Sequence, residues 1–240
     1  MKIAFLSLVL AFGLCFAQDP EIITIEYDIY SGYGDAPLTA IANLWPACTV
    51  EGYNGNPAGW VNDIDENTDI AIGDMHNYGL TDVSAYQKLT DWYNNPALGP
   101  MFYACWMMQY SYDDALTAAM GISAVSAIGM PPAPHYLWEV AHPIADGITD
   151  WSYADPGYGT GGNRLTVSDA VPVTGWTASS SPGQAALCVA NDGESIISGY
   201  FASLNPTQAV DLWENILTFM WGEEGLTPST WGNIKAEFGI

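Results

Sequence analysis

The sequence predicts an α/β fold: a flavodoxin-like, mostly parallel sheet with helices on both faces, followed by a strand-rich C-terminal half. Strand-like apolar runs alternate with helical patterns through the first half, which is the order that parallel sheets require. Hydrophobic residues make up 49% of the 240 residues, enough for a large core without disulfide cross-links. After residue 164 the strand-like runs follow one another without long helices between them.

The first half supplies the parallel part of the predicted sheet. A helix begins at Pro37, because proline suits the first turn, and Leu38, Ile41 and Leu44 recur on one of its faces. The next helices cover about Val83–Trp92 and Tyr112–Met120, the latter with Ser111 as its N-cap. Tyr53–Pro57 is expected to be a loop. The predicted strands are Ile22–Tyr30, Cys48–Glu51, Asp69–Gly73 and Met101–Cys105.

The second half begins with a segment rich in proline and glycine. Residues 129–164 are therefore predicted to be an ordered surface excursion without long elements. Asn191-Asp192-Gly193 predicts a hairpin turn, since Asn and Gly tolerate positive φ. A helix over Thr207–Trp221 closes the domain. The predicted strands are Leu165–Val167, Val171–Trp176, Ala185–Ala190 and Ser195–Tyr200.

The N-terminus has the pattern of a cleaved secretory signal. Met1-Lys2 is a short basic start, and Ile3–Phe16 is an apolar run too short to span a bilayer comfortably. Cleavage is expected between Ala17 and Gln18, which leaves one domain over residues 18–226 and a tail over 227–240. A lipoprotein signal is the weaker alternative, because Leu14 stands where a small residue should precede the cysteine. We therefore expect a secreted, extracellular protein, and no other segment is apolar enough to span a membrane.

Charge limits the partners of the chain. Twenty-seven acidic residues against four basic ones give a net charge of -23, which opposes binding to nucleic acid and to anionic lipid. Charged residues are only 13% of the chain, while Trp and Tyr number 10 and 14. A surface poor in lysine and rich in aromatic residues is typical of protein interfaces. This predicts a homo-oligomer or polymer, or contact with extracellular surface polymers; alternatively, the aromatic residues fill the core of a sheet covered on both faces.

Three cysteines remain after the expected cleavage, namely Cys48, Cys105 and Cys188. Each lies in an apolar stretch, which is typical of buried structural cysteines. An odd number does not indicate a disulfide framework, and at most one pair could form.

Several short motifs resemble a known fold. They are the strand end Gly73-Asp74-Met75, a Tyr-Ser-Tyr-Asp helix start after the fourth strand, His142-Pro143-Ile144, and Gly199 before the final helix with Asp211-Leu212-Trp213-Glu214-Asn215. Over residues 22–221 the chain resembles the class I glutamine amidotransferase-like fold, in its trehalose-utilization-like branch. The resemblance implies a nucleophilic cysteine on a glycine-flanked elbow after the fourth strand, activated by a His-x-Glu after a late strand.

The chain departs from that pattern at the residues that carry catalysis. Cys105 stands where the nucleophile is expected, but residues 103–107 contain no glycine, and Phe201-Ala202-Ser203 follows the late strand in place of His-x-Glu. The chain is therefore expected to lack the catalytic triad. An alternative set is Cys105 with His76, oriented by Asp74, because neighbouring parallel strands bring their carboxyl ends together. On this alternative the protein is a secreted hydrolase or amidase.

One acidic loop suggests a metal. Asp63, Asp65 and Asn67 place oxygen ligands at alternate positions, as calcium loops do. Thr68 and Asp74 stand where a calcium-binding loop needs Gly and Glu, so an ordinary acidic loop is the alternative. No cofactor other than calcium is predicted. The favoured function is a non-enzymatic structural or interaction protein that self-associates, as a subunit of a filament or surface layer.

Overall fold

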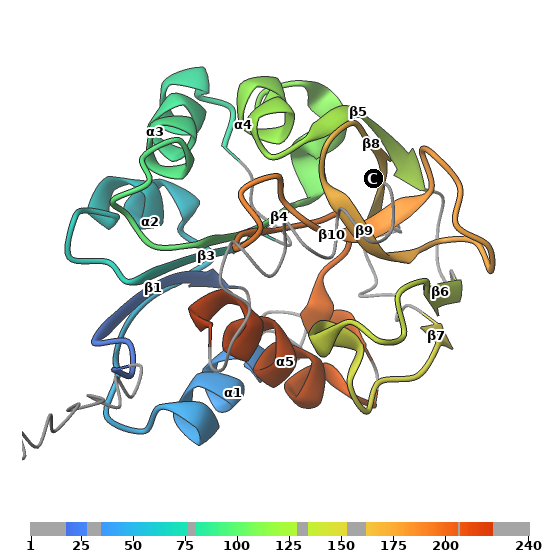
Figure 1. Cartoon of the computed structure of the whole chain (residues 1–240). Coiled ribbons are helices and arrows are strands. Elements are labelled where there is room, and N and C mark those ends of the chain that lie inside the picture. The colour runs from blue at the N-terminus through green and yellow to red at the C-terminus, as the bar shows by residue number, and fades with distance from the viewer. Residues whose placement is uncertain are drawn as a thin grey trace, which may run out of the picture.

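The computed structural model describes residues 18–27, 35–75, 80–128, 134–152, 162–205 and 207–222. These residues form an eleven-stranded mixed sheet in the order β2-β1-β3-β4-β11-β10-β9-β6-β7, with β8 attached to β10 and β5 to β8. Helices α1 and α5 cover one face, and α2, α3 and α4 cover the other (Figure 1). The prediction of an α/β fold with covered faces is confirmed. The expected signal sequence and the tail lie outside the described residues.

Five strands form the parallel part of the sheet. Each of the contacts β1–β2, β1–β3, β3–β4 and β4–β11 is parallel. Strands β3 and β4 are buried throughout, as expected for apolar strands between two helical layers. The five strands are β1 (Ile22–Tyr27), β2 (Thr49–Asn54), β3 (Ile70–Met75), β4 (Met101–Cys105) and β11 (Ile196–Ser198).

Five α-helices are described: α1 (Ala36–Leu44), α2 (Pro57–Asp63), α3 (Val83–Tyr93), α4 (Asp114–Ala119) and α5 (Ala209–Trp221). Helix α2 was not predicted, although Asn56 caps it by accepting a hydrogen bond from the Gly59 N–H and Pro57 opens it. The expected cap at Ser111 was wrong. Asp113 precedes α4, whereas Ser111 has φ 64 and ends a 3-10 turn, η1 (Trp106–Tyr110).

The remaining strands are mostly antiparallel, and the predicted hairpin between β10 and β11 is confirmed, with Gly193 at φ 84 in its turn. Strand β5 was missed because its Ser and Ala residues show no apolar alternation. The 129–164 segment contains β6, a short 3-10 turn η2 (Pro143–Ala145), β7 and the start of β8. These strands are β5 (Ile122–Ile128), β6 (Pro134–Leu137), β7 (Trp151–Ser152), β8 (Gly162–Val167), β9 (Val171–Gly175) and β10 (Ala185–Val189).

The core accounts for most of the tryptophans. Six of the ten are buried: Trp45, Trp60, Trp92, Trp151, Trp176 and Trp213. The other described tryptophans, Trp106, Trp138 and Trp221, are partly buried. The two covered faces of the sheet need large side chains, and the tryptophans fill them. For the six buried tryptophans the alternative interpretation holds, namely that aromatic residues fill the core of a sheet covered on both faces.

Candidate functional site

Cys105 is the last residue of β4, where the resemblance places a nucleophile. Its backbone is ordinary extended chain, with φ -147 and ψ 129, and it accepts a hydrogen bond from the Met107 N–H at 3.4 Å. A nucleophile elbow would instead hold this residue in a strained conformation. Among the described residues, Ser111 is the one non-glycine residue with positive φ. The turn after β4 therefore lacks the elbow geometry.

The surroundings of the Cys105 thiol keep it protonated. The side chain is 1% exposed, and the Tyr86 hydroxyl lies 3.9 Å from Sγ. Burial, with the nearby Asp113 charge as a smaller cause, raises the pKa of Cys105 to about 12. Since the thiolate is the reactive form, a thiol in this environment is a poor nucleophile near neutral pH.

Asp113, the residue before α4, is a buried acid within the helix predicted over Tyr112–Met120. The Tyr103 hydroxyl donates a hydrogen bond to its carboxylate. Burial raises the pKa of Asp113 to about 6. Its negative charge raises the pKa of Cys105, so Asp113 opposes formation of the thiolate rather than assisting it.

Asp74 lies on the opposite face of the sheet from Cys105. Asp74 is in register with Ala104, and Met75 is in register with Cys105, and successive side chains of a strand point to opposite faces. Cys105 packs in the core cluster under α2, α3 and α4. The Asp74 carboxylate accepts a hydrogen bond from the Ser203 hydroxyl at 2.9 Å, and that hydroxyl accepts one from the Trp213 indole of α5 at 3.1 Å.

In the predicted set His76 bonds to Cys105 and Asp74 orients His76, and the structure places Cys105 and Asp74 on opposite faces of the sheet. The two strand ends meet, but side chains alternate along each strand, so any link between Cys105 and Asp74 depends on His76. His76, the third member of the predicted set, lies outside the described residues.

The end of the late strand β11 leads to Tyr200 instead of a catalytic histidine. The ring of Tyr200 contacts His135 of β6, with ring centroids 4.1 Å apart, and His135 also stacks on Trp151 at 4.1 Å. The Nε2 atom of His135 is hydrogen-bonded to the Thr174 hydroxyl at 2.7 Å. Burial lowers the pKa of His135 to about 3, so this ring is a neutral core residue. The prediction of a surface excursion over residues 129–164 is therefore wrong for His135, which is buried.

The proposed calcium ligands lie at the end of α2 and in the following turn. The Asp63 carboxylate accepts a hydrogen bond from the Tyr53 hydroxyl at 2.5 Å. Asp65 accepts hydrogen bonds from the backbone and the side-chain amide of Asn67, at 2.9 and 3.1 Å. Within the described ranges, no group of three His, Cys, Asp or Glu side chains could hold a metal ion. Calcium binding here stays a prediction.

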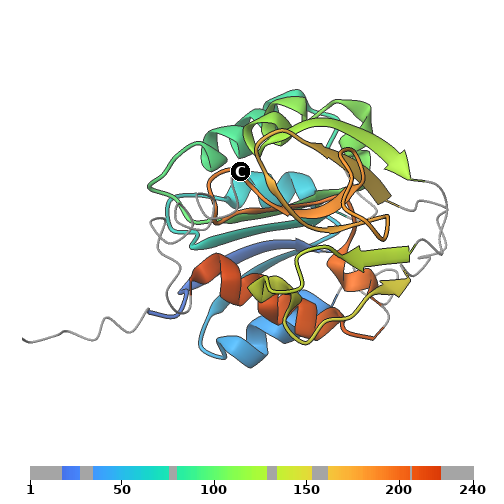
Figure 2. The same ribbon diagram turned by 45° about the vertical axis from the view of Figure 1, so that its right-hand side comes forward.

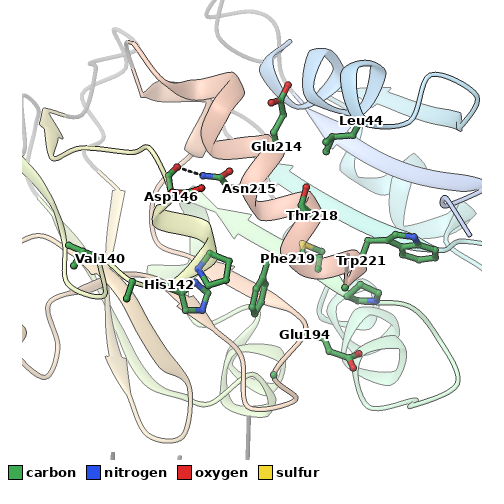
Figure 3. Close-up of a pocket in the computed structure, with 16 residues that line it drawn as sticks. Leu44, Val140, His142, Asp146, Glu194, Glu214, Asn215, Thr218, Phe219 and Trp221 are labelled. Carbon is green, nitrogen blue, oxygen red and sulfur yellow. Dashed lines mark hydrogen bonds between the residues drawn. The ribbon is translucent and has the colours of Figure 1, made fainter. Parts of the chain in front are cut away.

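A pocket of about 770 Å³ opens at the other end of the sheet, beside α5 and η2 (Figure 3). The rings of His142 and Phe219 face each other there, with centroids 4.9 Å apart. The Asn215 amide donates hydrogen bonds to the Asp146 and Ile144 carbonyls, at 2.8 and 3.2 Å, and so ties η2 to α5. Parallel sheets usually bind ligands at the carboxyl ends of their strands, and this pocket lies near the amino end of β4.

Comparison with known proteins supports the fold. No protein-family model matches the chain. No curated protein matches it either. A solved structure of a ThuA-like protein from Bacteroides uniformis superposes with a TM-score of 0.55 at 10% identity, over 85% of this chain and 93% of that one. A glutamine amidotransferase from Thermotoga maritima gives a TM-score of 0.50 at 8% identity, over 93% and 87%. The chain thus has a glutamine amidotransferase-like fold.

The described residues show no helix with the length and apolarity needed to cross a bilayer.

Proposed function

We propose that this is a secreted, non-enzymatic structural protein that self-associates, as a subunit of an extracellular filament or surface layer. The observation that supports self-association is the open rim of the sheet. Among the described residues, β2 pairs with β1 alone and β5 pairs with β8 alone. Such edges present unpaired backbone groups to a neighbouring chain unless they are protected. Secretion is part of the proposal and rests on the expected signal sequence.

The interior supports the non-enzymatic part of the proposal. Cys105 is 1% exposed, its pKa is raised to about 12, and Asp74 is bonded to Ser203 on the other face of the sheet. This arrangement favours a fold of the trehalose-utilization-like branch that has lost its catalytic triad. The order β2-β1-β3-β4-β11 of the parallel strands supports a flavodoxin-like arrangement for that part of the sheet.

The alternative of a hydrolase or amidase has one observation in its favour, the position of Cys105 at the carboxyl end of β4. It requires Cys105 to become exposed and deprotonated. The proposal for a structural protein requires neither.

Electron microscopy of the purified secreted chain tests the proposal. The protein should form filaments, sheets or large oligomers at high concentration, with calcium screening the acidic surface in a parallel sample. Dispersed monomers in both samples would overturn the proposal.

A further inference from the structure

The outer edge of β2 is an exposed backbone edge. The N–H groups of Thr49 and Gly55 donate to the Glu21 and Tyr27 carbonyls on the β1 side, both at 2.8 Å. Since backbone groups alternate sides along a strand, the N–H groups of Val50, Gly52 and Asn54 face the open edge. Val50 is 38% exposed. The strand contains no lysine or proline, which commonly block edge pairing, and Glu51 is its one charged residue.

The outer edge of β5 is the second such edge. Its sequence Ile-Ser-Ala-Val-Ser-Ala-Ile carries no charge and no proline. Ser123, Ala124, Ser126 and Ala127 are exposed. Strands β5 and β8 form a ribbon at the rim of the molecule (Figure 2). The exposed side chains of β5 are small. Along its outer edge the Ala127 carbonyl is bonded to the Arg164 guanidinium at 2.9 Å, which leaves the other outward backbone groups for a neighbouring strand.

The charges beside the two edges differ in sign. Six acidic residues line a pocket beside β2: Glu21, Glu51, Asp63, Asp65, Glu66 and Asp69. Beside β5, Arg164 of β8 stands opposite Ser126. Its Nη1 group donates to the Ala127 carbonyl at 2.9 Å and its Nε group is buried, so the rest of the half-buried guanidinium carries the positive charge at this edge.

Two copies could pair through two β2 edges, through two β5 edges, or through one of each, and the charges favour the last. Pairing β2 with a second β2 would bring two sets of six carboxylates together, and like charges at this range repel. Pairing β5 with a second β5 would bring the two Arg164 side chains toward each other. Pairing β2 with β5 brings the acidic side of one copy to the basic residue of the next.

We propose that the chain assembles head to tail, with β2 of one copy adding as a further strand to the open edge of β5 in the next copy. This inference rests on the proposed self-association and names its surfaces. The contact uses two different surfaces, so it leaves one free edge at each end of every oligomer. A contact of that kind extends into an open chain unless its rotation happens to close a ring.

Two single variants test the contact, one in β2 and one in β5. Val50→Pro removes an N–H group that faces the open edge and leaves the bonds to β1 in place. Ala124→Asp places a negative charge on the exposed edge of β5, where the acidic side of β2 would arrive. Each should weaken association by about tenfold or more, as expected for an edge hydrogen bond or a repelling charge. Val50→Thr and Ala124→Ser are the matched controls and should associate like the native chain.

Mixing the two variants identifies the pairing, with sedimentation velocity as the measurement. The Val50→Pro chain keeps a working β5, and the Ala124→Asp chain keeps a working β2. Each should stay monomeric alone, and an equal mixture should form dimers that grow no further. Unchanged melting temperatures against the control variants show that the effect is on the contact and not on folding.

Several results would overturn the inference. If Ala124→Asp alone still forms dimers and Val50→Pro does not, two β2 strands pair with each other; the reverse pattern indicates two β5 strands. If the native chain assembles and both variants assemble equally well, the contact lies elsewhere, and the proposed function survives without this inference. A native chain that is monomeric throughout removes both.

Discussion

The end of β4 and the rim of the sheet differ in how far their polar groups are exposed to solvent. At the end of β4 the Cys105 thiol is buried, hydrogen-bonded and held in its protonated form. At the rim, backbone groups of β2 and side chains of β5 are open to solvent. The position that the resemblance associates with chemistry is closed to substrate, and the positions available to a partner lie on strand edges. The difference supports the proposed role in contact between copies rather than in catalysis.

The largest effect on stability should come from a substitution that leaves a cavity in the core. Trp213 is fully buried against Phe102, with ring centroids 4.5 Å apart, and donates to the Ser203 hydroxyl. Trp213→Ala should lower the free energy of unfolding by about 3–5 kcal/mol. The rim control Val50→Thr should change it by about 0.5 kcal/mol or less. Denaturant unfolding of both variants measures the contrast, and equal losses would refute it.

Acid should destabilise the interior by a somewhat smaller amount. Burial lowers the pKa of His135 to about 3 and that of His142 to about 4, so between pH 4 and 6.5 the unfolded chain binds two more protons at these residues. Asp113 acts in the opposite direction below pH 6, because its pKa is raised in the folded chain. Together the three groups let the unfolded chain bind about one proton more than the folded chain. The free energy of unfolding should therefore fall by about 1.4 kcal/mol for each pH unit from pH 6 to pH 4.

The variant His135→Gln tests the origin of that slope. It removes one titrating ring from the unfolded chain, so stability should become nearly independent of pH between 6 and 4. Urea unfolding at several pH values gives the slope for both proteins. If the variant keeps the native slope, His135 is not the source.

The smallest expected effect is a difference in thiol labelling. Burial raises the pKa of half-buried Cys48 to about 11, against about 12 for Cys105, so its thiolate fraction should be about tenfold larger. Cys105 and Cys188 are also buried, and all three thiols are free. An alkylating reagent should therefore modify Cys48 first in the native protein, with peptide mass spectrometry locating the label. Preferential labelling of Cys105, with loss of amidase or esterase turnover in Cys105→Ala, would favour the hydrolase alternative.

Much of the fold could be predicted from local sequence pattern. Strands β3 and β4 were identified by unbroken apolar runs, which follow from burial on both faces. Helix α5 was identified by its helical spacing, which follows from burial on one face. Strand β5 shows neither pattern, since its Ser and Ala residues are exposed on an edge. Helix α2 is too short to show a helical period, although Asn56 and Pro57 mark its start.

The candidate site was harder to predict because it depends on contacts between distant segments. The position of Cys105 at a strand end followed from the sequence, whereas its separation from Asp74 depends on strand register. The hydrogen bond from Tyr103 to Asp113 joins a strand to the start of α4, and no spacing in the sequence indicates it. His135 was assigned to the surface because prolines surround it, and its stacking on Trp151 requires the pairing of β6 with β7.

Sedimentation velocity of the native chain over a concentration series tests the central claim most directly. Head-to-tail addition predicts a distribution that moves steadily to larger species as concentration rises, without stopping at a dimer. A single monomer boundary at every concentration would contradict the account.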